Sequence, residues 1–267
     1  MFHTNTKNGI TYLTADTLSG VCHGFSTRTG GVSPAPWDSL NLGVGRGDEL
    51  TRVQENYRRF CAALGTDVNR VVLSKQIHED VVRHVTEEDI GKGLWRDRDY
   101  PSVDGMVTDV PHLPLVVFSA DCNVVLLYDP VRRAIGACHA GWRGTVNYIL
   151  GHTLDKMRAR YGTEGKEVIA CIGPGISLSA FEVGDEVYEA FRESGFPMDY
   201  ISEWKPDTHK YHIDLWAANR LQLLDFGVPS AQVETANICT FSRYEEFFSA
   251  RRLGIKSGRI LSGIMLK

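Results

Sequence analysis

Residues 119–144 read SADCNVVLLYDPVRRAIGACHAGWRG. Within this stretch, the apolar run VVLLY is followed by a turn that contains Asp129-Pro130 and then by a second apolar run, AIGA. A short apolar run, a turn with proline and another apolar run are typical of two buried strands that reverse direction at the turn. The pattern therefore predicts buried strands over 124–128 and 134–137.

Candidate metal ligands flank these two predicted strands. Cys122 precedes the first strand and His139 follows the second, so a rigid scaffold can present both side chains. A thiolate and an imidazole are ligands that soft or borderline metals prefer, with zinc first among them. A third candidate, His78, lies upstream in the sequence KQIH. The separations along the chain are too long for a local zinc finger, so the fold must assemble any shared site.

The residue types alone leave three interpretations of this trio open. Three protein ligands with a free fourth position are typical of catalytic zinc, which lowers the pKa of a bound water and polarises a substrate oxygen. A cysteine near a histidine also suits a nucleophile and its general base, as in thiol hydrolases. All three residues are equally compatible with ordinary core packing.

Composition excludes several classes of protein. The chain has 267 residues, of which 43% are hydrophobic, and this is enough for one large core or two small ones. The net charge of −4 provides no basic surface for nucleic acid. The polar start resembles no signal peptide, and no apolar run approaches the roughly 20 residues that a bilayer requires. Six scattered cysteines without a C-x-x-C pair indicate reduced thiols. We therefore expect a cytoplasmic protein with no membrane or nucleic-acid partner.

Hydrophobic periodicity and turn residues predict intermixed helices and strands. Residues 86–100 are charged and turn-rich, which predicts a mobile loop or lid, and residues 198–209 read as irregular. With no internal repeat and no linker, one α/β or α+β domain over 1–267 is the simplest prediction. The expected helices are 48–64, 145–161, 185–193 and 214–226, and the further expected strands are 9–14, 21–26, 71–73, 81–85, 115–118, 168–172, 233–238 and 260–266.

A long glycine-rich loop over 27–48 is the second candidate for a functional segment. Ser26, Arg28, Asn41 and Arg46 lie in or beside it, and these side chains suit an anion or a sugar. Loops of this length in compact proteins are usually functional or disordered, so a solvated surface loop is the alternative interpretation.

A family resemblance decides between these interpretations. The block HAGWRG at 139–144, with ADC at 120–122 and QIH at 76–78, resembles the signature of the YfiH family. This family is also called the laccase-domain or multicopper polyphenol oxidase family, and its members are described as purine nucleoside phosphorylases. The chain departs from the family pattern at Ala250, where an aromatic residue is common. Further matching blocks are GFSTRTGGVS at 24–33, SLNLG at 39–43, VDG at 103–105, FEVG at 181–184, and FFS at 247–249 followed by Arg251-Arg252 and Gly258-Arg259.

The resemblance implies a single catalytic domain of the α/β (α+β) type, with mixed β-sheets packed together and flanked by helices in αββα layers. It implies a zinc site formed by His78, Cys122 and His139, which would serve both as metal ligands and as the catalytic group. The implied reactions are phosphorolysis of adenosine, inosine, guanosine and methylthioadenosine, and deamination of adenosine. The implied partners are purine nucleosides and phosphate, and we expect a monomer or a weak homodimer.

Several polar residues are candidates for substrate contacts in this scheme. Arg143 and Arg28 suit a bidentate clamp on phosphate, although many surface arginines carry no function. Asp121 is the candidate to orient one of the metal ligands through a hydrogen bond. Trp142 either stacks on the base or belongs to the core. The residues expected to hold the nucleoside are Ser26 and Asn41.

Other activities remain as alternatives. Multicopper oxidases rely on several histidines, commonly in His-x-His pairs, and none of the nine histidines here forms such a pair. Copper would bind a His/Cys site more tightly than zinc in vitro and give weak polyphenol oxidation. A cytoplasmic amidase that edits peptidoglycan precursors would use the same metal-activated water. A regulator that binds nucleosides without turnover is the non-enzymatic alternative.

Overall fold

The computed structural model describes residues 1–267 and contains three β-sheets. In spatial order, the first sheet consists of β1 (Phe2–Lys7), β2 (Ile10–Ala15), β3 (Cys22–Ser26), β15 (Ile260–Met265), β7 (Leu115–Ser119) and β4 (Val72–Leu73). The second consists of β14 (Val233–Thr235), β10 (Ile169–Ile172), β8 (Asn123–Asp129), β9 (Ala134–Ala140), β6 (Gly105–Thr108) and β5 (Val82–His84). The third and smallest consists of β11 (Glu182–Val183), β13 (Lys210–Ile213) and β12 (Ser202–Lys205).

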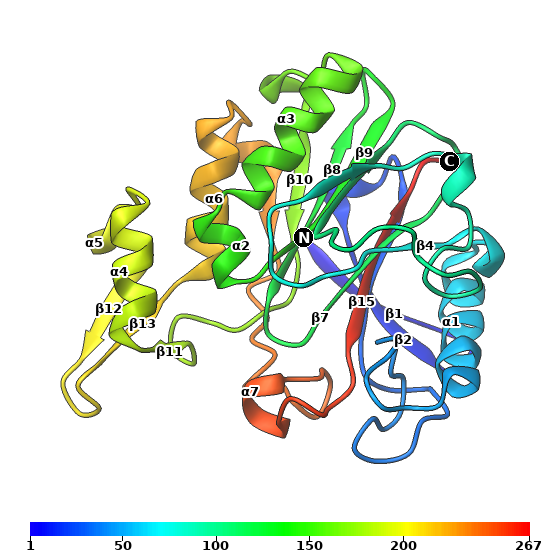
Figure 1. The fold of residues 1–267 in the computed structure, drawn as a ribbon, viewed down its shortest axis with the longest axis horizontal. Helices are drawn as coiled ribbons and strands as arrows, with labels where there is room; N and C mark the ends of the chain where they lie inside the picture. Colours follow the sequence, from blue (N-terminus) through cyan, green and yellow to red (C-terminus); the bar gives the residue numbers. More distant parts are fainter.

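Seven α-helices accompany the sheets (Figure 1). None of these helices combines the length and the apolar character needed to cross a bilayer. All six cysteines are free thiols. The helices are α1 (Leu50–Leu64), α2 (Trp142–Val146), α3 (Ile149–Tyr161), α4 (Asp185–Glu193), α5 (Met198–Ile201), α6 (Leu215–Asp225) and α7 (Ala250–Leu253).

The two large sheets pack face to face, and their central strands are buried on both sides. In β7, Val117 belongs to the core shared by the two sheets, whereas Val116 belongs to the core beneath α1. In β8, Leu126 points into the shared core and Leu127 into the core beneath α3. Because successive side chains alternate between faces, a strand that is covered on both faces must be apolar throughout. This explains the continuous apolar runs in the sequence.

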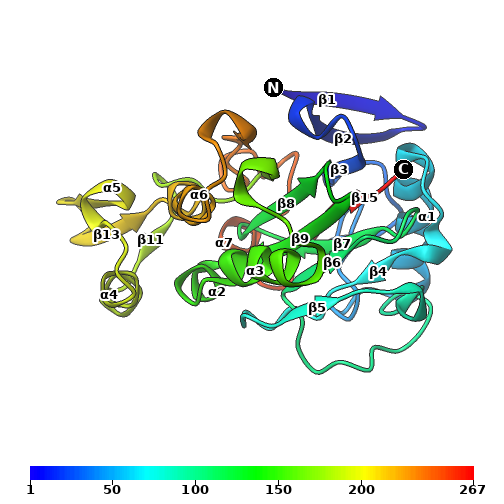
Figure 2. The same cartoon turned by 90° about the horizontal axis from the view of Figure 1, so that it is seen from above.

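Helices cover the outer face of each large sheet (Figures 1 and 2). Helix α1 packs Val53, Tyr57 and Phe60 against the first sheet and ends at Gly65, whose φ of 77° is left-handed. Helices α3 and α6 cover the second sheet. The prediction of an α+β fold with αββα layers is therefore confirmed.

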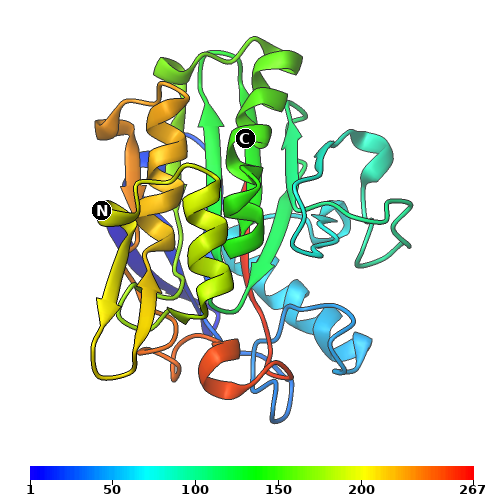
Figure 3. The same ribbon diagram turned by 60° about the vertical axis from the view of Figure 1, so that its left-hand side comes forward.

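The third sheet forms a lobe with α4 and α5 to one side of the layers (Figures 1 and 3). Its own small core contains Phe181, Phe191, Ile201 and Ile213. The prediction that residues 198–209 are irregular is wrong, because this segment contains α5 and β12.

The structure corrects one further prediction and confirms part of another. The single helix predicted over 145–161 is two helices, α2 and α3, because Tyr148 adopts a left-handed φ of 58° between them. The segment 86–100 is a loop, as predicted, with one short 3₁₀ helix, Glu87–Asp89, and its mobility and role as a lid stay predictions. Ion pairs link its parts. Lys92 Nζ lies 2.8 Å from Asp89 Oδ1 and 2.7 Å from Asp99 Oδ2.

Candidate metal centre

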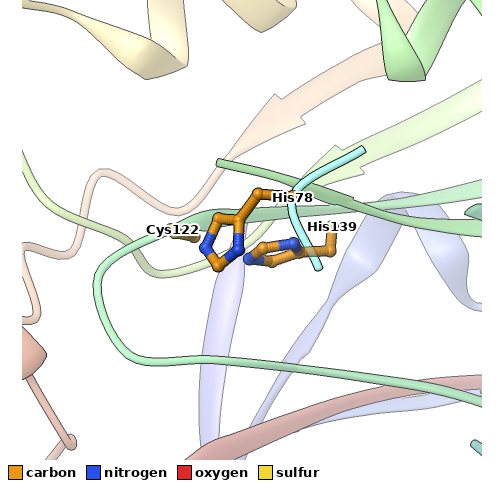
Figure 4. Close-up of side chains that lie close together, drawn as sticks. All are labelled: His78, Cys122 and His139. Atoms are coloured by element: carbon orange, nitrogen blue, oxygen red, sulfur yellow. The ribbon is translucent and has the colours of Figure 1, made fainter. Parts of the chain in front are cut away.

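Three candidate ligands meet at the ends of two central strands of the second sheet. Strands β8 and β9 are antiparallel and pair Val124 with His139, so Cys122, just before β8, lies beside the end of β9. His78 comes from the loop between β4 and β5. One ligand atom from each of the three residues lies within 4.8 Å of the other two. Figure 4 shows the two imidazole rings side by side, with a nitrogen of each ring turned toward the other ring.

The buried carboxylate of Asp104, at the start of β6, holds both imidazole-bearing segments. Its Oδ1 accepts hydrogen bonds from the amides of Ile77 (3.0 Å) and Glu79 (3.3 Å), and its Oδ2 accepts one from the amide of His78 (3.2 Å). These bonds fix a loop in which His78 has a left-handed φ of 68°. Oδ2 also lies 2.8 Å from Nδ1 of His139. An Nδ1 that donates to this carboxylate leaves the Nε2 lone pair of His139 free for a metal.

The electrostatics of the trio favour the thiolate of Cys122. Burial alone would raise the pKa of this thiol, but the His139 imidazolium and hydrogen bonds from His139 and His78 lower it to about 6. Burial would lower the pKa of His139, yet the Cys122 thiolate and Asp104 raise it to about 9. Burial raises the pKa of Cys138 to about 12, so that thiol stays protonated. Since metals bind the thiolate, Cys122 is prepared for coordination at neutral pH.

Gly141 provides the space in which the three side chains converge. A Cβ at this position would lie 3.0 Å from Cys122 Sγ, 3.2 Å from His78 Cδ2 and 3.5 Å from His139 Cε1. Any side chain here would therefore press on Cys122 and His78 and touch His139. One thiolate and two imidazoles, one of them oriented by a carboxylate, are a donor set that fits zinc with one coordination position left open.

Two cavities adjoin the trio and share Cys122 as a wall. The first, of about 310 Å³, is polar and also reaches His78 and His139. It contains four cationic side chains, namely Arg46, Lys75, Arg98 and Arg259. The second, of about 460 Å³, is lined mainly by apolar side chains, including Trp142, Ile176, Phe181 and Leu215. We call them the cationic chamber and the apolar chamber.

Neither of the arginines that the sequence suggested as a phosphate clamp lines either chamber. The guanidinium of Arg28 is held by Asp38 at 3.0 Å and by the carbonyl of Tyr244 at 2.9 Å, and it lies 4.8 Å from the centre of the Phe248 ring. The exposed guanidinium of Arg143 lies 4.3 Å from the centre of the Trp142 ring. The guanidinium of Arg28 is thus engaged by neighbours outside the chambers, whereas that of Arg143 packs against Trp142, which lines the apolar chamber.

Ser26 and Asn41, the candidates for nucleoside contacts, are fully buried and bind the backbone instead. Ser26 Oγ accepts a hydrogen bond from the amide of Leu261 at 2.9 Å. Asn41 Oδ1 accepts from the amides of Gly43 and Arg259, each at 3.0 Å. Gly43 and Arg259 line the cationic chamber, so Asn41 fixes the backbone of two residues in the wall of this chamber.

Asp121 was the candidate to orient a metal ligand, and the structure gives its carboxylate other partners. It accepts hydrogen bonds from the hydroxyl of Thr240 and from the amide of Arg251, each at 2.7 Å. The carboxylate that contacts His139 is Asp104, which the sequence analysis did not select. Its position in the VDG block was the only available signal.

Comparisons with known proteins identify the family of this chain. Residues 22–267 match the family model described as multi-copper polyphenol oxidoreductase laccase. The crystal structure of the Bacillus licheniformis hypothetical protein YfiH superposes with a TM-score of 0.92 at 34% identity and covers 99% of each chain. The chain belongs to the YfiH laccase-domain family.

Two curated relatives of this YfiH-family chain have names that describe activities. A purine nucleoside phosphorylase from Bacteroides thetaiotaomicron is 46% identical over 264 residues, which is 98% of each chain. The adenosine deaminase RL5, from an unknown prokaryotic organism, is 36% identical and covers 95% of this chain and 97% of its own length.

Proposed function

We propose that this chain is a zinc-dependent purine nucleoside phosphorylase that acts on adenosine, inosine, guanosine and methylthioadenosine and also deaminates adenosine. It would thus be both a metal-dependent transferase and a hydrolase. The observation that carries the proposal is the trio of His78, Cys122 and His139, which lies between a cationic and an apolar chamber. Relatives named purine nucleoside phosphorylase and adenosine deaminase give further support.

In this proposal, the two imidazoles and the thiolate hold the metal, and Asp104 keeps His139 in the tautomer that can bind it. A zinc ion with a free coordination position polarises a substrate oxygen and lowers the pKa of a bound water, which is the chemistry that deamination of a purine ring requires. The Cys122 thiolate also brings a negative charge that lowers the net charge of the centre.

The apolar chamber suits the purine base. Trp142 and Phe181 provide aromatic surface, and Ile176 and Leu215 provide aliphatic surface. Planar bases bind to such walls through stacking and burial of apolar area. Because Cys122 belongs to both chambers, a nucleoside seated here would have its ribose near the trio. The base would lie on one side of the metal and the cationic chamber on the other.

Mass spectrometry of the products from adenosine, with and without phosphate, tests the proposal. Adenine and ribose 1-phosphate that form only with phosphate indicate phosphorolysis, and inosine with ammonia indicates deamination. Cys122→Ala and His139→Ala should abolish both activities, whereas Cys138→Ala, a buried thiol outside the trio, should not. Turnover of muropeptide substrates alone would support the amidase, binding without turnover would support the regulator, and oxidation of polyphenols alone would support the copper enzyme. Each of these last three outcomes would refute the proposal.

The proposal also includes the domain organisation, cellular location and oligomeric state of the enzyme. We infer that residues 1–267 act as one catalytic domain in the cytoplasm, as a monomer or weak homodimer, on small molecules rather than on nucleic acid. The six free thiols and the net charge of −4 support this inference. Light scattering of the purified protein measures the oligomeric state.

A further inference from the structure

The cationic chamber contains an excess of positive charge, because its four cationic side chains exceed the single thiolate of Cys122 in its lining. Its lining includes four cationic side chains and no aspartate or glutamate. None of the four, Arg46, Lys75, Arg98 and Arg259, forms an ion pair with a carboxylate. Concave surfaces with charge of one sign concentrate ligands of the opposite sign.

Arg98 has donors that lack acceptors. Its Nε and Nη2 atoms are buried, and neither has a hydrogen-bond partner in the protein. The guanidinium packs closely against Gly93, where a Cβ would lie 2.6 Å from Nε. A buried guanidinium without an acceptor is destabilising, so such groups are normally paired. Arg98 also lines the chamber, where a bound anion would compensate its charge.

Arg259 is fixed in place by hydrogen bonds to carbonyl groups. Its guanidinium donates to the carbonyls of Ser257 (2.7 Å), Gly258 (2.8 Å) and Ile255 (3.1 Å). Carbonyl oxygens orient a guanidinium without cancelling its charge. Burial and the neighbouring Arg46 lower the pKa of Arg259 to about 10, so it remains a cation at neutral pH. The chamber thus offers positioned positive charge beside the metal trio.

We propose that the cationic chamber binds the phosphate that takes part in phosphorolysis, with Arg98 and Arg259 as its principal ligands and Arg46 and Lys75 at its margin. This inference rests on the proposed function. A small dianion with several acceptor oxygens matches guanidinium forks that have no carboxylate partner. The roles that the sequence suggested for Arg28 and Arg143 then belong to Arg98 and Arg259.

The arrangement is consistent with the chemistry of the reaction. An oxygen of hydrogen phosphate forms a bond to C1′ of the ribose as the bond from C1′ to N9 of the purine breaks. The electron pair of the broken bond leaves with the purine, which takes the proton that hydrogen phosphate gives up. Phosphate in one chamber and the base in the other would place C1′ between them, which is the alignment this displacement needs.

Kinetics of Arg98→Gln, Arg98→Lys and Arg46→Gln test the inference, with Arg96→Gln as the matched control. Arg96 lies on the same segment but is exposed and donates to the carbonyls of Glu88 and Ile90, outside the chamber. We expect Arg98→Gln to raise the KM for phosphate roughly 10- to 100-fold. Its effect on adenosine deamination, which consumes no phosphate, should be much smaller. Arg98→Lys should recover part of the loss, and Arg96→Gln should change neither activity.

Calorimetric titration with inorganic phosphate separates this inference from the proposed function. If the wild-type protein binds phosphate and Arg98→Gln does not, the chamber is a phosphate site even if no nucleoside is turned over. Arg46→Gln keeps the inference testable if Arg98→Gln does not fold, because Arg46 is exposed. An unchanged KM for phosphate in both variants would overturn the inference. An equal loss of phosphorolysis and deamination in Arg46→Gln, at the wild-type melting temperature, would also overturn it.

Discussion

Replacement of Gly141 by alanine should weaken metal binding with little effect on the rest of the fold. The backbone of Gly141, with φ −67° and ψ 168°, suits alanine, so the substitution acts through the added methyl group. That methyl would lie 3.0 Å from Cys122 Sγ and 3.2 Å from His78 Cδ2. Non-bonded carbon contacts are optimal at about 3.5–4.0 Å, so the ligands must move by about 0.5 Å.

A displacement of this size matters for a metal centre. Metal–ligand distances hold to about 0.2 Å, and disturbing the groups that position ligands typically lowers metal affinity about 10- to 100-fold. This corresponds to about 1.4–2.7 kcal/mol of binding free energy. Because zinc stabilises the fold by mass action, we also expect a smaller rise in melting temperature when zinc is added to Gly141→Ala than to wild type.

Competition between the protein and a chromophoric zinc chelator measures the affinity directly. Gly151→Ala is the matched control, since its new Cβ would lie 3.7 Å from Tyr148 Cβ, an ordinary contact within α3. It should bind zinc normally and gain about 0.5–1 kcal/mol of stability from the helix interior. Wild-type zinc affinity in Gly141→Ala would refute the assignment of the trio as the metal site.

Three further results are expected. Asp104→Asn should lower zinc affinity about 10- to 100-fold, because a side-chain amide cannot accept from three backbone amides and also orient His139. Competition with the chelator measures the affinity, and an unchanged value would contradict the prediction. In the metal-free protein, alkylation of Cys122 should accelerate as the pH rises through about 6 and then level off, because the lowered pKa moves thiolate formation to lower pH. Peptide mapping by mass spectrometry measures the alkylation rate, and a rise only near pH 9 would count against an ion pair between Cys122 and His139. Arg28→Met should leave the KM for phosphate unchanged and lower the free energy of unfolding by about 1–3 kcal/mol in urea titrations, since the hydrogen bonds of Arg28 are internal. A raised KM for phosphate would show that Arg28 contributes to phosphate binding.

The strands of the two-sheet core were predictable because burial on both faces leaves a clear mark in the sequence. Strand β8 is almost wholly apolar, and the sequence located it within one residue at each end. Strand β1 was missed for the opposite reason. Its sequence FHTNTK is mostly exposed, and it pairs only with β2 at the edge of the first sheet, so no apolar pattern indicates it. The break at Tyr148 was also missed, since neither glycine nor proline interrupts the helical pattern there.

The candidate site likewise contains some residues that the sequence predicted and some that it did not. The three ligands of the trio were predicted because cysteine and histidine have few chemical roles and the family blocks select which ones matter. Asp104 was not predicted, because its burial and its hydrogen bonds are what distinguish it. Arg98 was not predicted, because it is distinguished by buried nitrogen atoms that lack hydrogen-bond partners. Aspartate and arginine are common surface residues, so their sequence positions carry little information about either property.

The family description names copper, and the donor set of the trio is indeed the one that blue-copper proteins use, with two histidines and one cysteine. Blue-copper sites complete this set with a weak axial ligand, commonly methionine, and transfer electrons without binding a substrate at the metal. No methionine lines either chamber beside the trio. The trio instead adjoins a chamber of about 310 Å³ with four cationic side chains. A metal held by the trio with a free position beside this cationic chamber would be suited to reactions on a bound substrate, and this favours hydrolytic and phosphorolytic chemistry over electron transfer.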